Sequence, residues 1–480
     1  MRDQVAAGGA AMTVRQVVGA ALGMIGTLLS SRILGPAAYG VFAGAFRINF
    51  VLLSLFQLGA NVYIVKSQED PSHNRRLLGT ITWLLLFSAL AAVLITVAGA
   101  PLLRAWTHSR DMTIATVAMS CLLPVAMLTT VPQALLERSL AFRTIAQIEL
   151  LSSLSNYLVT VPAAALGLGY RAPILGWAVQ NATTATMMHL RAHHRPRFAW
   201  STAELRQAWS FCWNYSISMV IWQARNLAVP VILARYTGTE GVAYVSIAQK
   251  IIDALAFPRT VAYRLAISVI AKAKAEKRKL DSLVQHAIVV QVLIVTPLFL
   301  IVGALSTTIV GRLFGPQWTQ ALVVFWPLCA VAIIACAFNL LTSVLYVSNR
   351  PGTVNWFNAL NATILTLSAP VLTSRFGIKG YAVAELCCIP SYLYLLWAGK
   401  KYAALQYPAL ALGWLTAALG AIAIGNHPLA SACLLCAPML WAQSRKELSY
   451  LATLCRKALP THEHPIQLPL AVASSTATEG

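Results

Sequence analysis

Three basic side chains, Arg47, Arg225 and Lys250, lie inside long apolar segments of this 480-residue sequence. A charge at the centre of a membrane-spanning helix costs about 2.5–3.5 kcal/mol on insertion scales, so each cation needs a water-filled or paired setting. Arg47 follows Pro36 by 11 residues. At about 1.5 Å per residue it lies roughly 16 Å along a helix, near mid-depth. One charge pair about 4 Å apart gains about 4 kcal/mol at an effective dielectric of about 20. We therefore predict that the three cations together bind an anionic substrate.

Other readings of the same cations stay open. Lys250 and Asp253 are three residues apart and can neutralise each other along one helix. Arg47 can instead extend toward the membrane surface or pair with an acid across a helix interface.

Polar residues accompany these cations. Asn61 shares a helical face with Arg47, and Asn214 shares one with Arg225, so both are predicted to bind substrate. A later segment carries an asparagine at every third position, which can contact sugar hydroxyls or form hydrogen bonds between helices: Asn355, Asn358 and Asn361.

Acidic residues are scarce in the apolar segments. Asp253 and Glu385 are the candidates for ion coupling, because a buried carboxylate can exchange a proton or a sodium ion. Each can equally be the structural partner of a nearby cation.

Two stretches 203 positions apart are nearly alike, and each follows a long apolar run. Without a gap, the segment 31–48 aligns with 234–251. The alignment pairs Arg32 with Arg235, Gly35 with Gly238, and Arg47 with Lys250. In a membrane chain, a duplicated short loop followed by a helix with a buried cation is typical of a two-lobed transporter whose binding site lies between the lobes. The paired arginines and glycines are predicted to form its gate loops.

Composition predicts an all-α polytopic membrane protein. The chain is 58% hydrophobic and 11% charged, with mean hydropathy +0.67, far outside the range of soluble domains. The apolar runs are continuous rather than alternating, which disfavours a barrel. We expect 12 core helices in two six-helix lobes and a C-terminal pair, 14 in total. The predicted spans are Gln16–Leu34, Tyr39–Val65, Leu77–Leu103, Met112–Leu136, Thr144–Leu166, Ala172–Leu190, Ala208–Ala234, Gly241–Ile270, Leu283–Val310, Ala321–Val347, Thr353–Thr373, Gly377–Trp397, Ala409–Ile424 and Leu429–Gln443.

Charge predicts the domain arrangement and the orientation. We divide the chain into an N-terminal lobe with a cytoplasmic connector (1–206), a C-terminal lobe (207–405), an extra helix pair (406–445) and a tail predicted to be disordered (446–480). Basic residues number 23 in one set of alternate loops and 8 in the other. Because the richer side is cytoplasmic, both termini are expected inside. The net charge of +21 therefore reflects topology, and nucleic-acid binding is excluded because no soluble basic domain is present. The nine cysteines form no metal-binding pattern, so no metal or cofactor is predicted.

Several motifs resemble a known family. Arg32-Ile-Leu-Gly-Pro-x-x-Tyr-Gly-Val-Phe is similar to the loop between the first two helices of the polysaccharide transporter family, the Wzx-like flippases of the multidrug/oligosaccharidyl-lipid/polysaccharide exporter superfamily. Four further passages extend this resemblance over about the first 400 residues: Val131-Pro-Gln-Ala-Leu-Leu-Glu-Arg138, Gly167-Leu-Gly-Tyr-Arg-Ala-Pro-Ile-Leu-Gly176, Leu313-Phe-Gly-Pro-Gln-Trp318 and Arg375-Phe-Gly-Ile-Lys-Gly-Tyr-Ala382. Thr237 and Thr239 depart from the pattern, because the second loop of the family usually looks more like the first.

The resemblance implies a function. It implies a flippase of a bacterial cytoplasmic membrane that moves undecaprenyl-pyrophosphate-linked oligosaccharides by alternating access, for exopolysaccharide, capsule or O-antigen assembly. Expected partners are the lipid-linked substrate, membrane lipids, a coupling proton or sodium ion, and a polysaccharide polymerase with its export machinery. The alternatives are a multidrug/cation antiporter of the same superfamily and a membrane polymerase or ligase. The excess of buried bases over acids disfavours the antiporter, and the short outer loops disfavour an enzyme.

Overall fold

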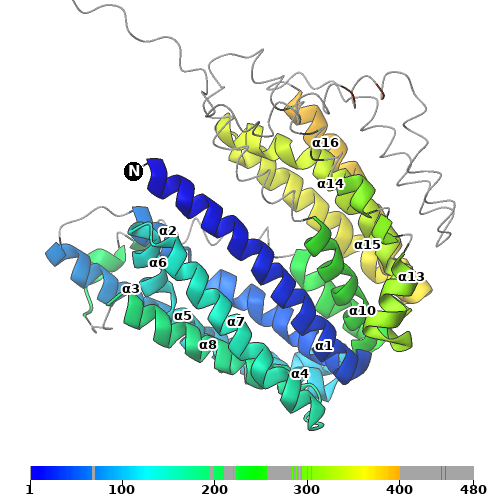
Figure 1. The fold of residues 1–480 in the computed structure, drawn as a ribbon, viewed down its shortest axis with the longest axis horizontal. Coiled ribbons are helices and arrows are strands. Elements are labelled where there is room, and N and C mark those ends of the chain that lie inside the picture. The colour runs from blue at the N-terminus through cyan, green and yellow to red at the C-terminus, as the bar shows by residue number, and fades with distance from the viewer. Residues whose placement is uncertain are drawn as a thin grey trace, which may run out of the picture.

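The structure is a computed structural model, and Figure 1 shows its fold. It describes residues 2–66, 71–193, 199–206, 208–209, 225–256, 295–299, 301–303 and 305–400, with 220, 223, 284, 288, 291, 445 and 449 as single residues. The predicted C-terminal helix pair and the tail lie outside the described residues, apart from positions 445 and 449. The count of fourteen spans therefore stays a prediction.

The described residues form helices joined by short turns, without a β-strand, which confirms the all-α prediction. The N-terminal lobe contains α1 (Arg2–Phe56), α2 (Ala60–Lys66), α3 (Pro71–Thr107), α4 (Arg110–Ser120), α5 (Leu123–Leu128), α6 (Thr130–Arg138), α7 (Phe142–Ala165) and α8 (Arg171–Arg191). The C-terminal lobe contains η1 (Val229–Leu233), α10 (Ala234–Leu255), α13 (Ser306–Ile309), η2 (Val310–Phe314), η3 (Pro316–Trp318), α14 (Ala321–Val347), α15 (Pro351–Leu386) and α16 (Ile389–Gly399).

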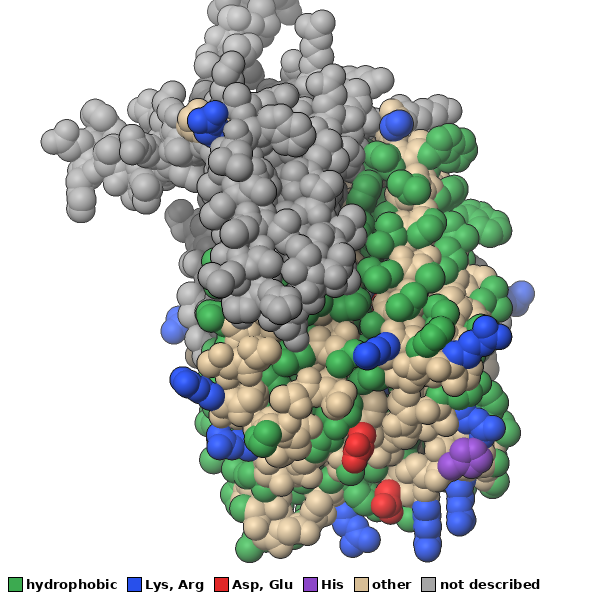
Figure 2. All heavy atoms as spheres, turned by 90° about the vertical axis from the view of Figure 1, so that its right-hand side faces the viewer, with side chains coloured by type: hydrophobic (Ala, Val, Ile, Leu, Met, Phe, Trp, Pro, Cys, Tyr) green, Lys and Arg blue, Asp and Glu red, His purple; other side chains and the backbone are tan. Residues whose placement is uncertain are grey.

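Several of these helices suit a membrane by length and apolarity. Five described segments qualify: Ala21–Phe56, Arg76–Thr107, Arg110–Arg138, Ala321–Val347 and Pro351–Gly399. The segments Val295–Gly303 and Ser306–Phe314, bent by 64°, make a sixth if they form one span. Large apolar side chains point outward from the helices, including Leu94, Leu158 and Leu367, each at least 60% exposed. Figure 2 shows such a hydrophobic flank above a lower end that carries Lys and Arg side chains. The chain is a multi-pass membrane protein.

The two repeated loops have the same backbone. Gly35 has φ 70° and ψ 174°, and Gly238 has φ 69° and ψ −172°. This region of backbone space is open essentially to glycine alone. Each glycine sharply redirects its chain, so α1 and α10 each contain two helical arms. The repeat found in the sequence is thus a repeat of conformation.

The lobes meet at the end of the molecule that carries these two glycines. A Cβ on Gly40 of α1 would lie 1.8 Å from the carbonyl oxygen of Thr239 in α10, so the two backbones touch. Tyr39 and Tyr244 pack edge-on against the buried Trp318, with ring centroids 5.6 and 6.0 Å away. From this contact the described helices of the two lobes diverge (Figure 1).

Several predicted spans are interrupted, and two of them show why the sequence did not indicate the break. The span Tyr39–Val65 breaks between α1 and α2, where Leu58 and Gly59 have φ of 55° and 64°. The span Met112–Leu136 is divided into α4, α5 and α6 by short turns. In both cases the flanking residues continue an apolar run, so hydropathy alone did not indicate the break.

Candidate functional site

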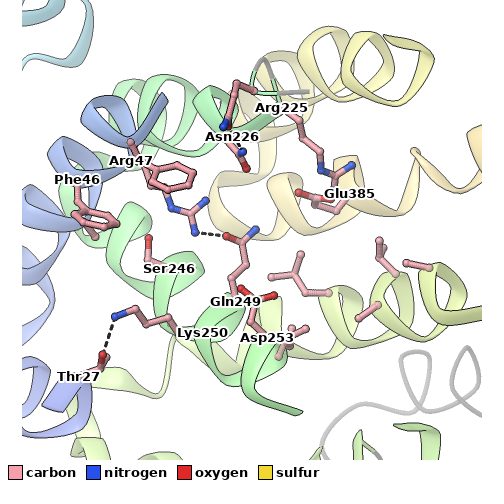
Figure 3. A pocket seen from close by; sticks show the side chains of 18 of the residues that line it. Thr27, Phe46, Arg47, Arg225, Asn226, Ser246, Gln249, Lys250, Asp253 and Glu385 are labelled. Atoms are coloured by element: carbon pink, nitrogen blue, oxygen red, sulfur yellow. Dashed lines mark hydrogen bonds and ion pairs between the residues drawn. The ribbon is translucent and has the colours of Figure 1, made fainter. Parts of the chain in front are cut away.

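A cavity of about 1240 Å³ lies between the lobes. Its described walls come from α1, α7 and α8 on one side and from α10, α14, α15 and α16 on the other. Five charged residues singled out in the sequence line it: Arg47, Arg225, Lys250, Asp253 and Glu385. Figure 3 shows them around one space.

Arg47 and Lys250 are held by neutral partners, and each reaches the opposite lobe. The Arg47 guanidinium donates to Oε1 of Gln249 in α10. The Lys250 ammonium donates to Oγ1 of Thr27 in α1 at 2.7 Å (Figure 3). Lys250 and Asp253 are both described, and no ion pair joins them. Because an amide and a hydroxyl do not neutralise a cation, both charges remain available to an anion in the cavity.

Arg225 and Glu385, to which the sequence gave different roles, form one ion pair (Figure 3). The Glu385 side chain is 1% exposed and that of Arg225 is 33% exposed. Tyr381 donates its hydroxyl to Oε1 of Glu385 at 2.8 Å. Arg225 also donates to Asn361, whose amide nitrogen donates to Ser391 at 2.8 Å. The charge of Arg225 is therefore largely balanced within the C-terminal lobe.

Of the remaining predicted substrate residues, Asn61 is not brought to the cavity. Asn61 lies in α2, beyond the break at Leu58 and Gly59, and is not among the described lining residues. The break interrupts the helical phase that related Asn61 to Arg47. Asn214 lies outside the described residues.

At the end where the two lobes touch, which we call the closed end, each of the two predicted gate arginines contacts the opposite lobe. Arg32 of the N-terminal lobe donates to the carbonyl oxygens of Arg312 and Leu313 at 3.4 and 3.5 Å. Arg235 of the C-terminal lobe donates to those of Ala105 and Trp106, at 3.4 and 3.1 Å, and contacts the ring of His108. Its guanidinium also lies 5.2 Å from the centre of the Trp106 ring.

Three phenylalanines of the cavity wall were not anticipated from the sequence. Phe42, Phe46 and Phe50 follow one another at four-residue spacing on α1 and all line the cavity, together with Trp177 of α8. The four-residue spacing of these phenylalanines could have predicted that they line one face together, since positions four apart share a helical face.

Comparison with known proteins supports this architecture. The sequence model of the family described as "Polysaccharide biosynthesis protein" matches residues 29–323. No curated protein matches the chain. A structure of the lipid II flippase MurJ in an inward closed conformation has 13% identity and a TM-score of 0.73, covering 93% of this chain and 99% of MurJ.

Multidrug transporters have the same architecture. The MATE multidrug transporter DinF-BH has 14% identity and a TM-score of 0.57, covering 85% of this chain and 97% of that protein. An inward-facing MATE transporter of the MOP superfamily has 13% identity and a TM-score of 0.56, covering 81% and 95%. At these identities the likeness shows the fold, whereas the family model covers more than half of the sequence. The chain therefore belongs to the polysaccharide biosynthesis protein family and has the fold shared by MurJ and the MATE transporters, as the sequence motifs predicted.

Proposed function

We propose that this protein is a flippase that moves undecaprenyl-pyrophosphate-linked oligosaccharide units across a bacterial cytoplasmic membrane, for exopolysaccharide, capsule or O-antigen assembly. Membership of a polysaccharide biosynthesis family supports a substrate that carries a glycan. The fold shared with a lipid II flippase supports a lipid-linked substrate.

The observation that carries the proposal is the placement of Arg47 and Lys250. They occupy equivalent positions of the internal repeat, come from opposite lobes and face one cavity, and the hydrogen bonds that hold them in the described structure go to neutral groups. Two such cations can hold the two phosphates of the carrier, because a charged hydrogen bond to phosphate is about twice as strong as a neutral one. Arg225 lines the same cavity and contributes once its pair with Glu385 rearranges.

Alternating access follows from the shape of the interface. The lobes touch at the Gly35 and Gly238 end, and the cavity lies between the diverging helices beyond it. In the proposed cycle, substrate enters from the cytoplasmic side and leaves after this end has opened. Asp253 and Glu385 are the proposed carriers of a coupling proton or sodium ion, and a polymerase with its export machinery is the proposed acceptor of the product.

The orientation can be tested directly. Cysteines introduced at Gly311 and Gly352 have open space around the new side chain. With both termini cytoplasmic, an impermeant thiol reagent added to intact cells should label Gly311→Cys and spare Gly352→Cys. The opposite labelling would invert the proposed direction of transport.

The function is tested by deletion and by binding. A strain lacking the protein should accumulate a lipid-linked glycan on the inner leaflet. Arg47→Ala and Lys250→Ala should each weaken binding of undecaprenyl pyrophosphate by about tenfold or more. The double variant should lose less than the sum, since both cations grip one headgroup. Arg47→Lys should keep partial function because the charge remains. Wild-type affinity in a folded double variant would contradict the proposal.

A further inference from the structure

The cavity contains a polar wall that the diphosphate site does not use. Asn355 and Asn358 lie three residues apart on α15, so both amides project from one face of the helix. Both are half-buried and line the cavity. Within the described part of the chain, neither side-chain amide forms a hydrogen bond, whereas Asn361, one turn further on, is fixed by Arg225 and Ser391. Each such amide offers two donors and one acceptor to a ligand.

Aromatic rings face the same space from the other lobe. Phe46 and Phe50 are 36% and 48% exposed although they line the cavity. Their rings are stacked with centroids 6.4 Å apart, and Trp177 meets Phe46 edge-on at 6.3 Å. Exposed rings inside a cavity are available as a binding surface, because nothing in the described fold covers them.

Both walls extend beyond the cationic pair, on the side away from the closed end. Phe50 follows Arg47 by one helical turn on the arm of α1 that leads away from Gly35. Asn355 lies near the start of α15, directly after α14 has run its 27 residues away from Trp318 and the closed end. Phe50 and the two asparagines therefore lie farther from the closed end than Arg47, toward the side where the lobes diverge.

We propose that the space between the Phe46–Phe50 stack and the Asn355–Asn358 pair is a glycan subsite that selects uncharged sugars. A sugar presents apolar C–H faces and a rim of hydroxyls, which match a ring on one side and free amides on the other. The described residues of these two walls offer a uronic acid no further cation, because Arg47 is engaged by the diphosphate in the proposed complex and Arg225 is paired with Glu385. An isoprenoid chain would leave both amides unsatisfied, which disfavours a role in binding the lipid tail.

This inference rests on the proposed flippase function, and it adds a division of the cavity. Arg47 and Lys250 hold the headgroup, and the two walls hold the sugars attached to it. The carrier is then oriented with its sugars toward the cytoplasmic side when it first binds. Binding of the glycan at these walls should be separable from binding of the diphosphate.

The test uses the full-length protein in nanodiscs and two probes. One is undecaprenyl pyrophosphate without sugar, and the other is the lipid-linked intermediate purified from a strain lacking the protein. The variants are the double change Asn355→Ala/Asn358→Ala and the single change Phe50→Leu, which keeps an apolar side chain but removes the ring. Phe87→Leu is the matched control: Phe87 is 53% exposed on α3, stacks on the residue four positions earlier, and does not line the cavity.

Wild-type protein should bind the glycosylated probe about tenfold more tightly than the bare one. The asparagine pair should reduce that preference about fivefold, the worth of two neutral hydrogen bonds, and leave the bare probe unaffected. Phe50→Leu should act in the same direction and Phe87→Leu should have no effect. Equal wild-type affinity for the two probes, or equal weakening of both by the variants, would overturn the glycan subsite while the headgroup site stands. Failure of wild-type protein to bind either probe would overturn the proposed function together with this inference.

Discussion

The two lobes place equivalent residues at their interface, yet these residues have different surroundings. Arg235 meets two carbonyls, an imidazole and an indole ring, whereas its counterpart Arg32 meets two carbonyls at long distance. Lys250 is held by a hydroxyl, and its counterpart Arg47 by an amide. The repeat thus specifies where a cation stands and that it crosses to the opposite lobe. The individual lobe specifies how firmly the cation is held there.

The closest approach of the lobes is asymmetric in the same way. With the repeat offset, Gly40 of α1 corresponds to Ala243 of α10, and the Ala243 methyl lies 3.3 Å from where a Cβ on Gly40 would be. The N-terminal lobe therefore leaves space at Gly40, and the Ala243 methyl group of the C-terminal lobe packs next to that space. Both helices depend on this contact to close this end of the molecule.

Gly40→Val should have the largest effect. Its Cβ would fall 1.8 Å from the backbone oxygen of Thr239, which cannot swing away as a side chain can. We expect the closed outer end to be lost, with flipping reduced at least about tenfold, the equivalent of about 1.4 kcal/mol. A cysteine in place of Ala43 should become reactive to an impermeant reagent from outside.

Two matched changes make this result specific. Gly99→Val adds the same side chain to α3 at a position with nothing within 4 Å and should leave flipping unchanged. Ala243→Gly removes the filling residue and should be tolerated. Normal flipping by Gly40→Val would show that the tight contact is dispensable.

Glu385→Gln should come next, through stability. It removes the anionic partner of the Arg225 guanidinium at a position, residue 385, where the side chain is only 1% exposed. The loss should be about 3 kcal/mol, the low end for a broken buried pair because Arg225 is partly exposed. Arg47→Ala should cost far less, since its partner is a neutral amide. Thermal unfolding in detergent measures both changes.

The double change Arg225→Gln/Glu385→Gln distinguishes a structural pair from an ion-coupling site. If Glu385 serves only to balance Arg225, the double variant should regain most of the lost stability and also transport. Recovered stability with transport still absent would support the coupling role proposed for Glu385.

Residues could be placed from the sequence where a single segment contains all the information needed. Arg47 and Lys250 could be placed in the cavity because a fixed number of residues separates each from a glycine that redirects the helix. Placement from the sequence failed for Asn61, since the positive φ at Leu58 breaks a helix in a run that is otherwise apolar. The break depends on packing of α2 against α6, where Ile64 and Ala134 belong to one buried cluster.

The pairing of Arg225 with Glu385 could not be predicted from the sequence, for a different reason. These residues are 160 positions apart, and each could be matched with several other buried charges. Which carboxylate meets which cation is decided by how α15 packs, and a single sequence does not contain that information. The same holds for the rings and amides that face each other across the cavity.

Gly35→Ala and Gly238→Ala should have smaller and equal effects. Both positions have positive φ with nothing near the added methyl group, so the cost is backbone strain alone, about 2 kcal/mol. Thermal unfolding of the two variants should agree within about 0.5 kcal/mol, the usual margin for independent sites. A clear difference between them would mean that the loops are equivalent in shape but unequal in what they support.

The arginines of the closed end should show the smallest effects, and these should be unequal. Arg235→Ala removes a cation–π contact worth about 0.5–1 kcal/mol at an exposed site, together with hydrogen bonds of about 1 kcal/mol net. The closed state should therefore be disfavoured about tenfold. Arg32→Ala removes two bonds of 3.4 and 3.5 Å and should shift the same equilibrium about twofold. Labelling rates of Ala43→Cys from outside measure both shifts in one background. Trp106→Leu should reproduce most of the Arg235→Ala effect, because it removes both the ring under Arg235 and the 3.0 Å bond from its indole nitrogen to Val231. Equal shifts for Arg32→Ala and Arg235→Ala would mean that the closed end is held by the symmetric backbone contact, and that the unequal arginine contacts add little to it.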